Sequence, residues 1–305
     1  MHIYPSYYND FKCIASRCKH NCCIGWEIDI DESTMEFYNS VSGDFGQRLK
    51  DNINHLDIPY FKLSSDERCP FLNDKNLCDI IMTLGEKHLC DICTEHPRFH
   101  NALPDRIESG LGLCCEEAAR IILSQKEKVT LLNSKSTDDQ ILILRDKIID
   151  TLQNRDKTIE NRIEDMLSLC DTSLSKRPIS LYCDLLLSLE RMDEKWGELL
   201  NMLKENADAI DFERFDQFMK DRTHEYEQVL VYLIYRHFAN SPDTQEALKR
   251  ARFSAFSYEI LRALGAVIYY KTGDFDFEAH VELLRLFSSE IEYSDENLYT
   301  LFDTI

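Results

Sequence analysis

The stretch CIASRCKHNCC, residues 13–23, places four cysteines within eleven residues. More cysteines follow, so that ten of the twelve in the chain fall among the first 115 residues. In a secreted protein this density would indicate a disulfide framework, whereas in a reducing compartment metal binding explains it better. The start of the chain, Met1-His2-Ile3-Tyr4-Pro5, lacks the basic residues and apolar stretch of a signal peptide. We therefore expect a cytoplasmic protein with a metal centre in this region.

The predicted ligands fall into three groups along the chain. Thiolates are the preferred ligands of zinc and of iron–sulfur clusters, so all ten early cysteines are candidates, with buried free cysteines as the alternative. Neighbouring residues on a helix cannot both face one centre, which predicts at most one ligand from each adjacent pair unless the backbone there is irregular. The groups are Cys13, Cys18, Cys22 and Cys23, then Cys69, Cys78, Cys90 and Cys93, and finally Cys114 and Cys115.

Local patterns place these cysteines on short, broken elements. Residues 24–30 alternate enough for a strand, and Asp31 offers an N-cap for a helix through about residue 54. Residues 69–80 predict a hairpin in which Leu72 pairs with Leu77, so that Cys69 and Cys78 share a face. A helix is expected over residues 80–95, ending before Pro97. A helix N-terminus beside Cys114 and Cys115 would favour ionisation of one thiol.

Beyond residue 118 the apolar residues recur at helical spacing, as at Leu230, Leu233 and Ile234, and Pro178 and Pro242 lie near predicted helix starts. The predicted fold is therefore mainly α, with a small Cys-rich metal-binding region and short hairpin over residues 1–118. An all-helical domain follows over residues 119–305. Cys170 and Cys183 fall in the helical pattern and are expected in its core.

Composition excludes several functions. A formal charge of −20 argues against nucleic acid as a partner, and the longest apolar runs are far shorter than the ~20 residues of a membrane span. A solvated, soluble surface explains the acidity better than attraction of a basic substrate such as lysine does. No P-loop, G-x-S-x-G or G-x-G-x-x-G motif is present, and the cysteine spacing is not the C-x3-C-x2-C of radical S-adenosylmethionine enzymes.

The ordered set of motifs resembles the flagellin lysine-N-methylase (FliB) family. The resemblance covers roughly residues 4–123 and rests on FKC-x4-C-x3-CCIGW from Phe11, CPFL with LC from Cys69, LC-x2-C with PR from Leu89, and CCEEAAR from Cys114. It implies methyl transfer from S-adenosylmethionine to lysine side chains of flagellin, with an iron–sulfur cluster (4Fe–4S) held by the matching cysteines. Arg98, within the third motif, could hold a carboxylate or an anionic group of the cofactor, although a structural salt bridge explains an arginine there better.

Two functions of different classes follow from these residues. The first is a lysine N-methyltransferase with an iron–sulfur centre. The second is a non-catalytic protein in which zinc or a cluster fastens a small module that binds a partner. Structural and catalytic centres use the same thiolates, but a structural zinc is closed by four protein ligands and a catalytic centre keeps one position open. Acidic residues near the cysteines, Glu27, Asp29 and Glu116, could assist deprotonation of a lysine, although a role as a helix cap or a solvated charge explains each of them better.

Overall fold

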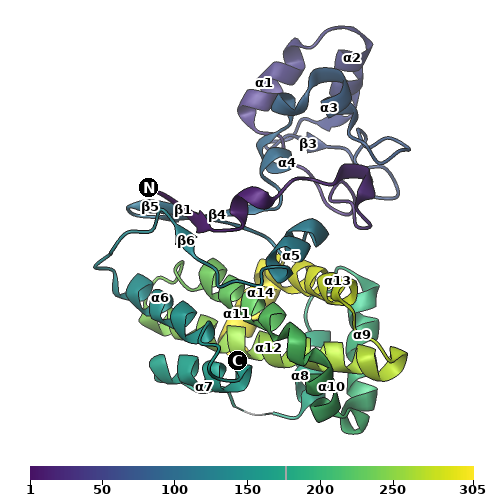
Figure 1. Cartoon of the computed structure of the whole chain (residues 1–305). Coiled ribbons are helices and arrows are strands. Elements are labelled where there is room, and N and C mark those ends of the chain that lie inside the picture. The colour runs from purple at the N-terminus through teal and green to yellow at the C-terminus, as the bar shows by residue number, and fades with distance from the viewer. Residues whose placement is uncertain (176) are drawn as a thin grey trace. The chain divides into compact units, whose positions relative to one another are not determined.

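The computed structural model describes residues 1–175 and 177–305. The chain forms two compact units, coloured along the chain in Figure 1. Unit 1 contains Met1–Phe11 and His100–Ile305, and unit 2 contains Lys12–Phe99. The predicted boundary near residue 118 falls within α5 (Glu116–Leu123) of unit 1. Composition changes there because cysteine becomes rare, but unit 1 also takes in the first eleven residues and residues 100–118.

A four-stranded sheet of order β4-β5-β1-β6 joins the start of the chain to later segments. β1 (His2–Pro5) runs parallel to β5 (Arg106–Leu111), with His2 opposite Ile107, and antiparallel to β6 (Leu131–Leu132), while β4 spans Arg98–Leu103. The buried Tyr235 hydroxyl donates to the carbonyl oxygens of Ile3 at 3.2 Å and Ser109 at 3.1 Å. This tyrosine therefore ties the sheet to α11 (Thr223–His237).

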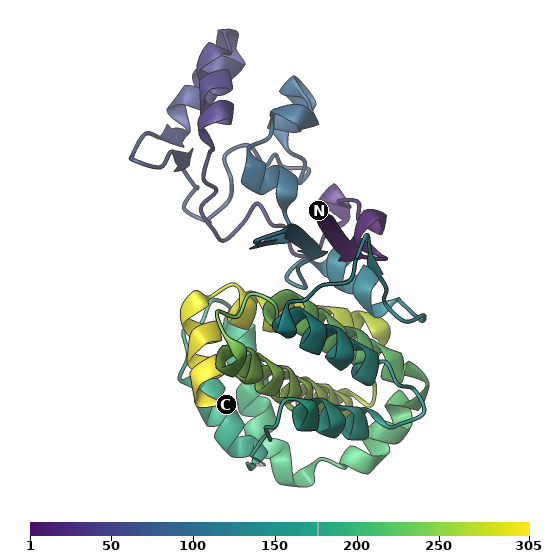
Figure 2. The same cartoon turned by 90° about the vertical axis from the view of Figure 1, so that its left-hand side faces the viewer.

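The rest of unit 1 is helical, which confirms the mainly α prediction. α11 and the 29-residue α12 (Thr244–Thr272) are its most buried helices, and Figure 2 shows the others arranged around them. α8 begins directly after Pro178 and α12 shortly after Pro242, as predicted. The surrounding helices are α6 (Gln140–Leu152), α7 (Ile159–Leu169), α8 (Ile179–Leu187), α9 (Glu194–Asn206), α10 (Phe212–Met219), α13 (Phe277–Phe287) and α14 (Asp295–Thr304).

Unit 1 contains two buried cysteines and one turn of unusual helix. Cys170 and Cys183 are buried in the helical core, as predicted. Between α13 and α14 the chain forms one π-helical turn, Ser288–Glu292, an uncommon form that often marks functional sites. Within residues 1–175 and 177–305, no helix is long and apolar enough to cross a membrane.

Unit 2 has short helices around a small apolar core. Asp31 caps α1 (Glu32–Ser40) as predicted, since its Oδ1 accepts from the Thr34 backbone N–H at 2.9 Å. The prediction of one helix through residue 54 is wrong, because the chain turns at Gly43 (φ +78°) and continues as α2 (Gly43–Asp51). The spacing of apolar residues in this segment gives no sign of the break between the two helices. Among the residues that the structure describes, the only two-stranded sheet is that of β2 (Ile53–Asn54) with β3 (Tyr60–Phe61).

The two other predictions in unit 2 need correction. The expected strand over residues 24–30 is reduced to isolated bridges, Ile24 with Arg68 and Asp29 with Tyr60. The expected helix over residues 80–95 is divided into α3 (Asp79–Leu84) and α4 (Asp91–Glu95) by Gly85, whose φ of +96° is open to glycine but costly for other residues. The prediction that the helical segment ends before Pro97 is confirmed, since α4 ends at Glu95.

Candidate metal centre

Six cysteines of unit 2 interact with one another in and beside its apolar core, with Cys22 exposed, and we call them the thiol cluster. Cys69 and Cys90 belong to the buried apolar core, and three of the others pack against it. Each interacts by hydrogen bonding or charge with at least one other member. The thiol cluster consists of Cys22, Cys23, Cys69, Cys78, Cys90 and Cys93.

Backbone pairing brings the first three segments together. The Cys69 backbone N–H donates to the Cys23 carbonyl at 2.8 Å, beside the bridge between Ile24 and Arg68. The predicted hairpin is present, but its register is wrong by one residue, since Leu72 pairs with Cys78 rather than with Leu77.

The side chain of Asn73 explains that shift. Its Oδ1 accepts from the backbone N–H groups of Lys75 at 2.9 Å and Leu77 at 3.1 Å, and Asn76 has a φ of +54°. An asparagine that organises the turn in this way sets the pairing independently of the apolar pattern. Cys78 consequently takes a place directly before α3, as its N-cap residue.

Short helices position the remaining thiols. Cys90 is the N-cap residue of α4, and Cys93 lies in its first turn. The two side chains are hydrogen bonded to each other, as their three-residue spacing predicts. Cys22 and Cys23 are also hydrogen bonded through their side chains, because the backbone there is irregular. In this pair, therefore, adjacency does not separate the two sulfur atoms.

The electrostatics of the thiol cluster disfavour several free thiolates at once. Burial raises the pKa of Cys69 to about 11, and it also raises that of Cys78. Within the Cys90–Cys93 pair, the hydrogen bond lowers the pKa of Cys90 and raises that of Cys93. The charges of neighbouring thiolates raise the pKa values of these cysteines further. A bound cation would reduce the repulsion between the thiolates, which no charged group of the protein offsets in the interactions described above.

Backbone N–H groups oppose this effect at individual sulfurs. Those of Phe71 and Leu72 hydrogen bond to Cys69, and those of Ile80 and Ile81 to Cys78. Hydrogen bonds to sulfur are among the features that tune iron–sulfur centres. The donor set thus fits a zinc ion or an iron–sulfur cluster by its chemistry. In the described part of the chain, no three potential ligands are arranged as a formed metal site.

The other predicted ligands lie elsewhere. Cys13 is exposed and accepts from the Ala15 backbone N–H at 3.4 Å, and Cys18 is partly buried after a short 3-10 turn. Cys114 and Cys115 belong to unit 1, where Cys115 is the N-cap residue of α5. Burial raises the pKa of Cys114 to about 12, which disfavours ionisation of this member of the pair, and the favouring of one thiol by the helix N-terminus stays a prediction.

Arg98 is partly buried at the start of β4, and its binding of a cofactor stays a prediction. Three histidines that lie near the cysteines in the sequence have contacts or an environment of their own. His88 stacks on Phe37 with ring centroids 3.9 Å apart, His100 hydrogen bonds to Ser109 at 2.7 Å, and burial lowers the pKa of His96 to about 4.

Sequence reasoning missed Tyr38 and a buried polar network in unit 1. Tyr38 is buried in the core of unit 2, and burial raises its pKa, with a further rise from the nearby charges of Cys90, Cys93 and Cys78. In unit 1 the fully buried Glu292 accepts from Tyr232 at 3.0 Å and contacts His237 at 2.7 Å. Single tyrosines and carboxylates separated by up to 60 residues carry no spacing signal by which this network could be found.

Together, these features define a two-unit, mainly helical protein with six neighbouring thiols in one unit. Residues 111–305, well over half of the chain, match the C-terminal domain of the FliB lysine N-methylase family. The chain therefore belongs to this family.

Individual relatives agree with this assignment. The flagellar biosynthetic protein FliU of Salmonella muenchen is 29% identical over 152 residues, which are 46% of this chain and 88% of that protein. Lysine-N-methylases of Salmonella choleraesuis and Salmonella typhimurium are each 30% identical over 138 residues, 42% of this chain. The match spans only 33% of the length of either methylase. No solved structure matches the chain.

Proposed function

We propose that this protein transfers methyl groups from S-adenosylmethionine to lysine side chains of flagellin. The observation that carries the proposal is membership of the FliB lysine N-methylase family over residues 111–305. Two relatives are named lysine-N-methylase and a third is named a flagellar biosynthetic protein, which supports the reaction and the flagellar substrate respectively.

The proposal includes an iron–sulfur cluster, with zinc as the alternative, held by ligands drawn from the thiol cluster. Cys69, Cys78 and Cys90 are the best candidates, because each receives a backbone hydrogen bond that favours the thiolate. Cys23 and Cys93 have raised pKa values through hydrogen bonds to their neighbouring thiols, so metal binding there would release protons. A bound iron–sulfur cluster would supply one-electron chemistry, whereas zinc would supply structure or Lewis acidity.

Polar methyl transfer needs a neutral amine, and lysine is normally protonated at neutral pH. Glu27 and Asp29 are exposed on the segment before α1, where a substrate lysine can reach them. Glu116 is buried at 4% exposure, with the Arg120 guanidinium 4.0 Å from it. Glu27 and Asp29 therefore suit the handling of a lysine ammonium better than Glu116 does.

One observation favours the second function, a non-catalytic metal module. Cys69 and Cys90 lie in the apolar core of unit 2, together with Phe71 and Ile80. A metal held there would fasten a small unit with little regular structure, in the way that structural zinc stabilises small domains. In that case the thiol cluster would be required for folding and no methyl transfer would occur.

The test is anaerobic purification of the whole chain, followed by incubation with flagellin and isotope-labelled S-adenosylmethionine. Mass spectrometry should find labelled methyl groups on flagellin lysines, and iron with acid-labile sulfide in the protein. Cys183→Ser is the matched control for Cys90→Ser, because Cys183 is also buried but belongs to unit 1 and not to the thiol cluster. Metal without methyl transfer would support the structural module, and methyl transfer by fully metal-free protein would remove the cluster from the proposal.

A further inference from the structure

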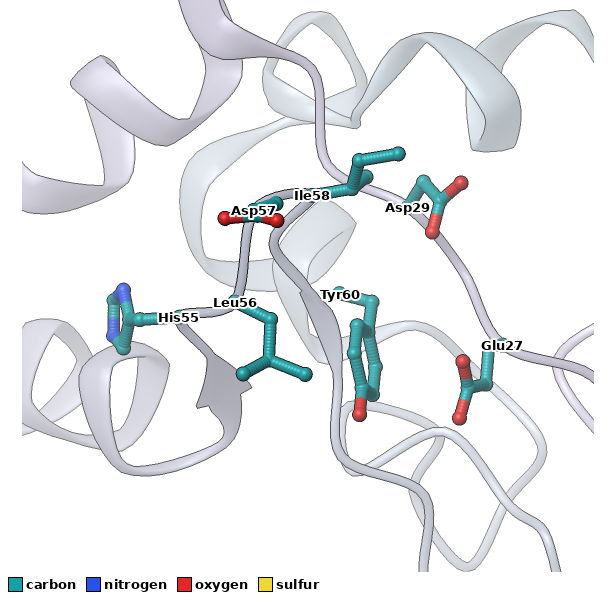
Figure 3. Close-up of a pocket in the computed structure, with 7 residues that line it drawn as sticks. All are labelled: Glu27, Asp29, His55, Leu56, Asp57, Ile58 and Tyr60. Carbon is teal, nitrogen blue, oxygen red and sulfur yellow. The ribbon is translucent and has the colours of Figure 1, made fainter.

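An open groove of about 670 Å³ lies on unit 2, and no cysteine of the thiol cluster is among its lining residues (Figure 3). It is formed by the segment before α1 and the loop between β2 and β3. These segments are joined by backbone hydrogen bonds from Ile30 N–H to the Pro59 carbonyl at 2.8 Å and from Phe61 N–H to the Ile28 carbonyl at 3.1 Å. The groove is lined by Glu27, Asp29, His55, Leu56, Asp57, Ile58 and Tyr60.

The extended backbone explains why two carboxylates line this groove. Ile28 and Ile30 are each 2% exposed and face the core. Because side chains alternate along an extended chain, Glu27 and Asp29 project to the opposite, exposed side. Asp57 adds a third exposed carboxylate from the facing loop. Among the described residues that line the groove there is neither lysine nor arginine.

The same loop exposes apolar side chains. Leu56 is 64% exposed and Ile58 is 61% exposed, although both belong to a residue type that is usually buried. Tyr60 is fixed by a hydrogen bond with the Asn54 amide nitrogen at 2.5 Å. In Figure 3 the Tyr60 ring lies between Leu56 and Glu27, while His55 points away from the carboxylates. The groove therefore places apolar surface beside uncompensated negative charge.

We propose that this groove binds the lysine-bearing segment of the protein substrate. This inference rests on the proposed function and assigns a place to its substrate. A lysine side chain has an aliphatic stem and a cationic end. Leu56, Ile58 and Tyr60 would cover the stem and the flanking residues, while Glu27, Asp29 and Asp57 would attract the ammonium. The volume of about 670 Å³ exceeds a single side chain and suits a short stretch of peptide.

The test uses the whole chain and a synthetic peptide, Gly-Leu-Lys-Leu-Gly with blocked ends, with binding measured by calorimetry. A matched peptide carries norleucine in place of lysine, which keeps the stem and removes the charge. The groove variant combines Glu27→Gln, Asp29→Asn and Asp57→Asn. The control variant combines Glu36→Gln, Asp44→Asn and Asp74→Asn, which are exposed in unit 2 and remove the same net charge.

The groove variant should bind the lysine peptide about tenfold more weakly than the wild type, given the usual strength of exposed ion pairs. The control variant should stay within about twofold, and added salt should weaken wild-type binding more than binding by the groove variant. The norleucine peptide should bind all three proteins equally weakly. Equal losses in the groove and control variants would overturn the proposal, because net charge alone would then explain the attraction.

A second pair of variants tests the apolar side of the groove. Leu56→Ser with Ile58→Ser should weaken lysine-peptide binding several-fold, since both side chains are exposed and their replacement leaves the core intact. Met82→Ser, at a side chain that is also 64% exposed, should have no effect. Unchanged binding by the double variant would contradict the assigned role of Leu56 and Ile58.

The outcomes separate this inference from the proposed function. Groove-dependent binding of the lysine peptide without any methylation of flagellin would support the groove and refute the methyltransferase proposal. Methylation of flagellin with the same KM in wild type and groove variant would support the methyltransferase proposal and refute the groove.

Discussion

Replacing Glu292 by Gln should destabilise unit 1 by roughly 3 kcal/mol at neutral pH. The carboxylate is fully buried, and it accepts from Tyr232 and lies 2.7 Å from His237 and 3.5 Å from Arg236. Despite burial, the Arg236 charge and the His237 hydrogen bond lower the pKa of Glu292 from 4.5 to about 2. A difference of about 2.5 pKa units corresponds to roughly 3 kcal/mol. Removal of the charge would also leave the Arg236 guanidinium buried without its counter-ion.

The dependence on pH has a definite sign. Because the folded-state pKa of Glu292 is lowered, its contribution is complete above 4.5 and is lost as the pH falls towards about 2. The difference in unfolding free energy between wild type and Glu292→Gln should therefore be full at pH 7 and smaller by about 1 kcal/mol at pH 3.5. Burial lowers the pKa of His237 as well, so its protonation below the ordinary 6.5 adds to acid destabilisation of both proteins.

Tryptophan fluorescence can isolate unit 1 in this measurement. The chain has two tryptophans, and a Trp26→Phe background leaves only Trp196. Trp196 is buried in α9, with its ring 6.2 Å from that of Phe287, the residue before the π-helical turn that contains Glu292. Urea unfolding followed by Trp196 fluorescence should then report the loss of stability of unit 1 directly. The matched control is Asp303→Asn, whose carboxylate is 69% exposed beside Lys249 and should change stability by less than about 1 kcal/mol. Equal effects of the two substitutions would refute the reasoning.

Three further predictions concern cysteines and one glycine. Serine variants of the thiol cluster, purified without oxygen, should contain less metal than the Cys170→Ser and Cys183→Ser variants, and equal metal contents would contradict the assigned ligands. The cluster variants are Cys22→Ser, Cys23→Ser, Cys69→Ser, Cys78→Ser, Cys90→Ser and Cys93→Ser. Iodoacetamide at pH 8.5 should alkylate the exposed Cys13 well before Cys114, because burial raises the pKa of Cys114 to about 12; equal rates by peptide mass spectrometry would count against this burial. Gly46→Ala should destabilise unit 2 by about 1–3 kcal/mol, since its Cβ would lie 2.0 Å from the Val41 carbonyl oxygen. Limited proteolysis should cut residues 12–99 faster in this variant than in Gln47→Ala, and identical cutting would contradict the close packing.

The helical part of the fold was predictable because its signals are local. Apolar residues at helical spacing and the prolines before α8 and α12 act within a few residues of each element. The breaks in unit 2 were not predictable from apolar pattern, because Gly43 and Gly85 divide helices by their positive φ alone. The hairpin register was decided by the Asn73 side chain rather than by the pairing of apolar residues.

The sequence predicted that the candidate site is made of cysteines, but it predicted less well which of these cysteines lie together. The spacing of Cys90 and Cys93 correctly predicted that their side chains meet. Cys22 and Cys23 meet as well, which depends on irregular backbone that the sequence pattern does not specify. Cys114 and Cys115 follow the other cysteines closely in sequence but fold with unit 1. The groove could not be predicted from the sequence, because it depends on the bridge between Asp29 and Tyr60, two residues far apart in the chain.

The most direct test of the central claim, lysine methylation dependent on the thiol cluster, is mass spectrometry of flagellin from the native organism. Three strains are compared: one with the gene, one without it, and one that carries the Cys90→Ser variant in its place. The account predicts methylated flagellin lysines in the first strain and unmodified lysines in the other two. Identical lysine methylation in strains with and without the gene would contradict it.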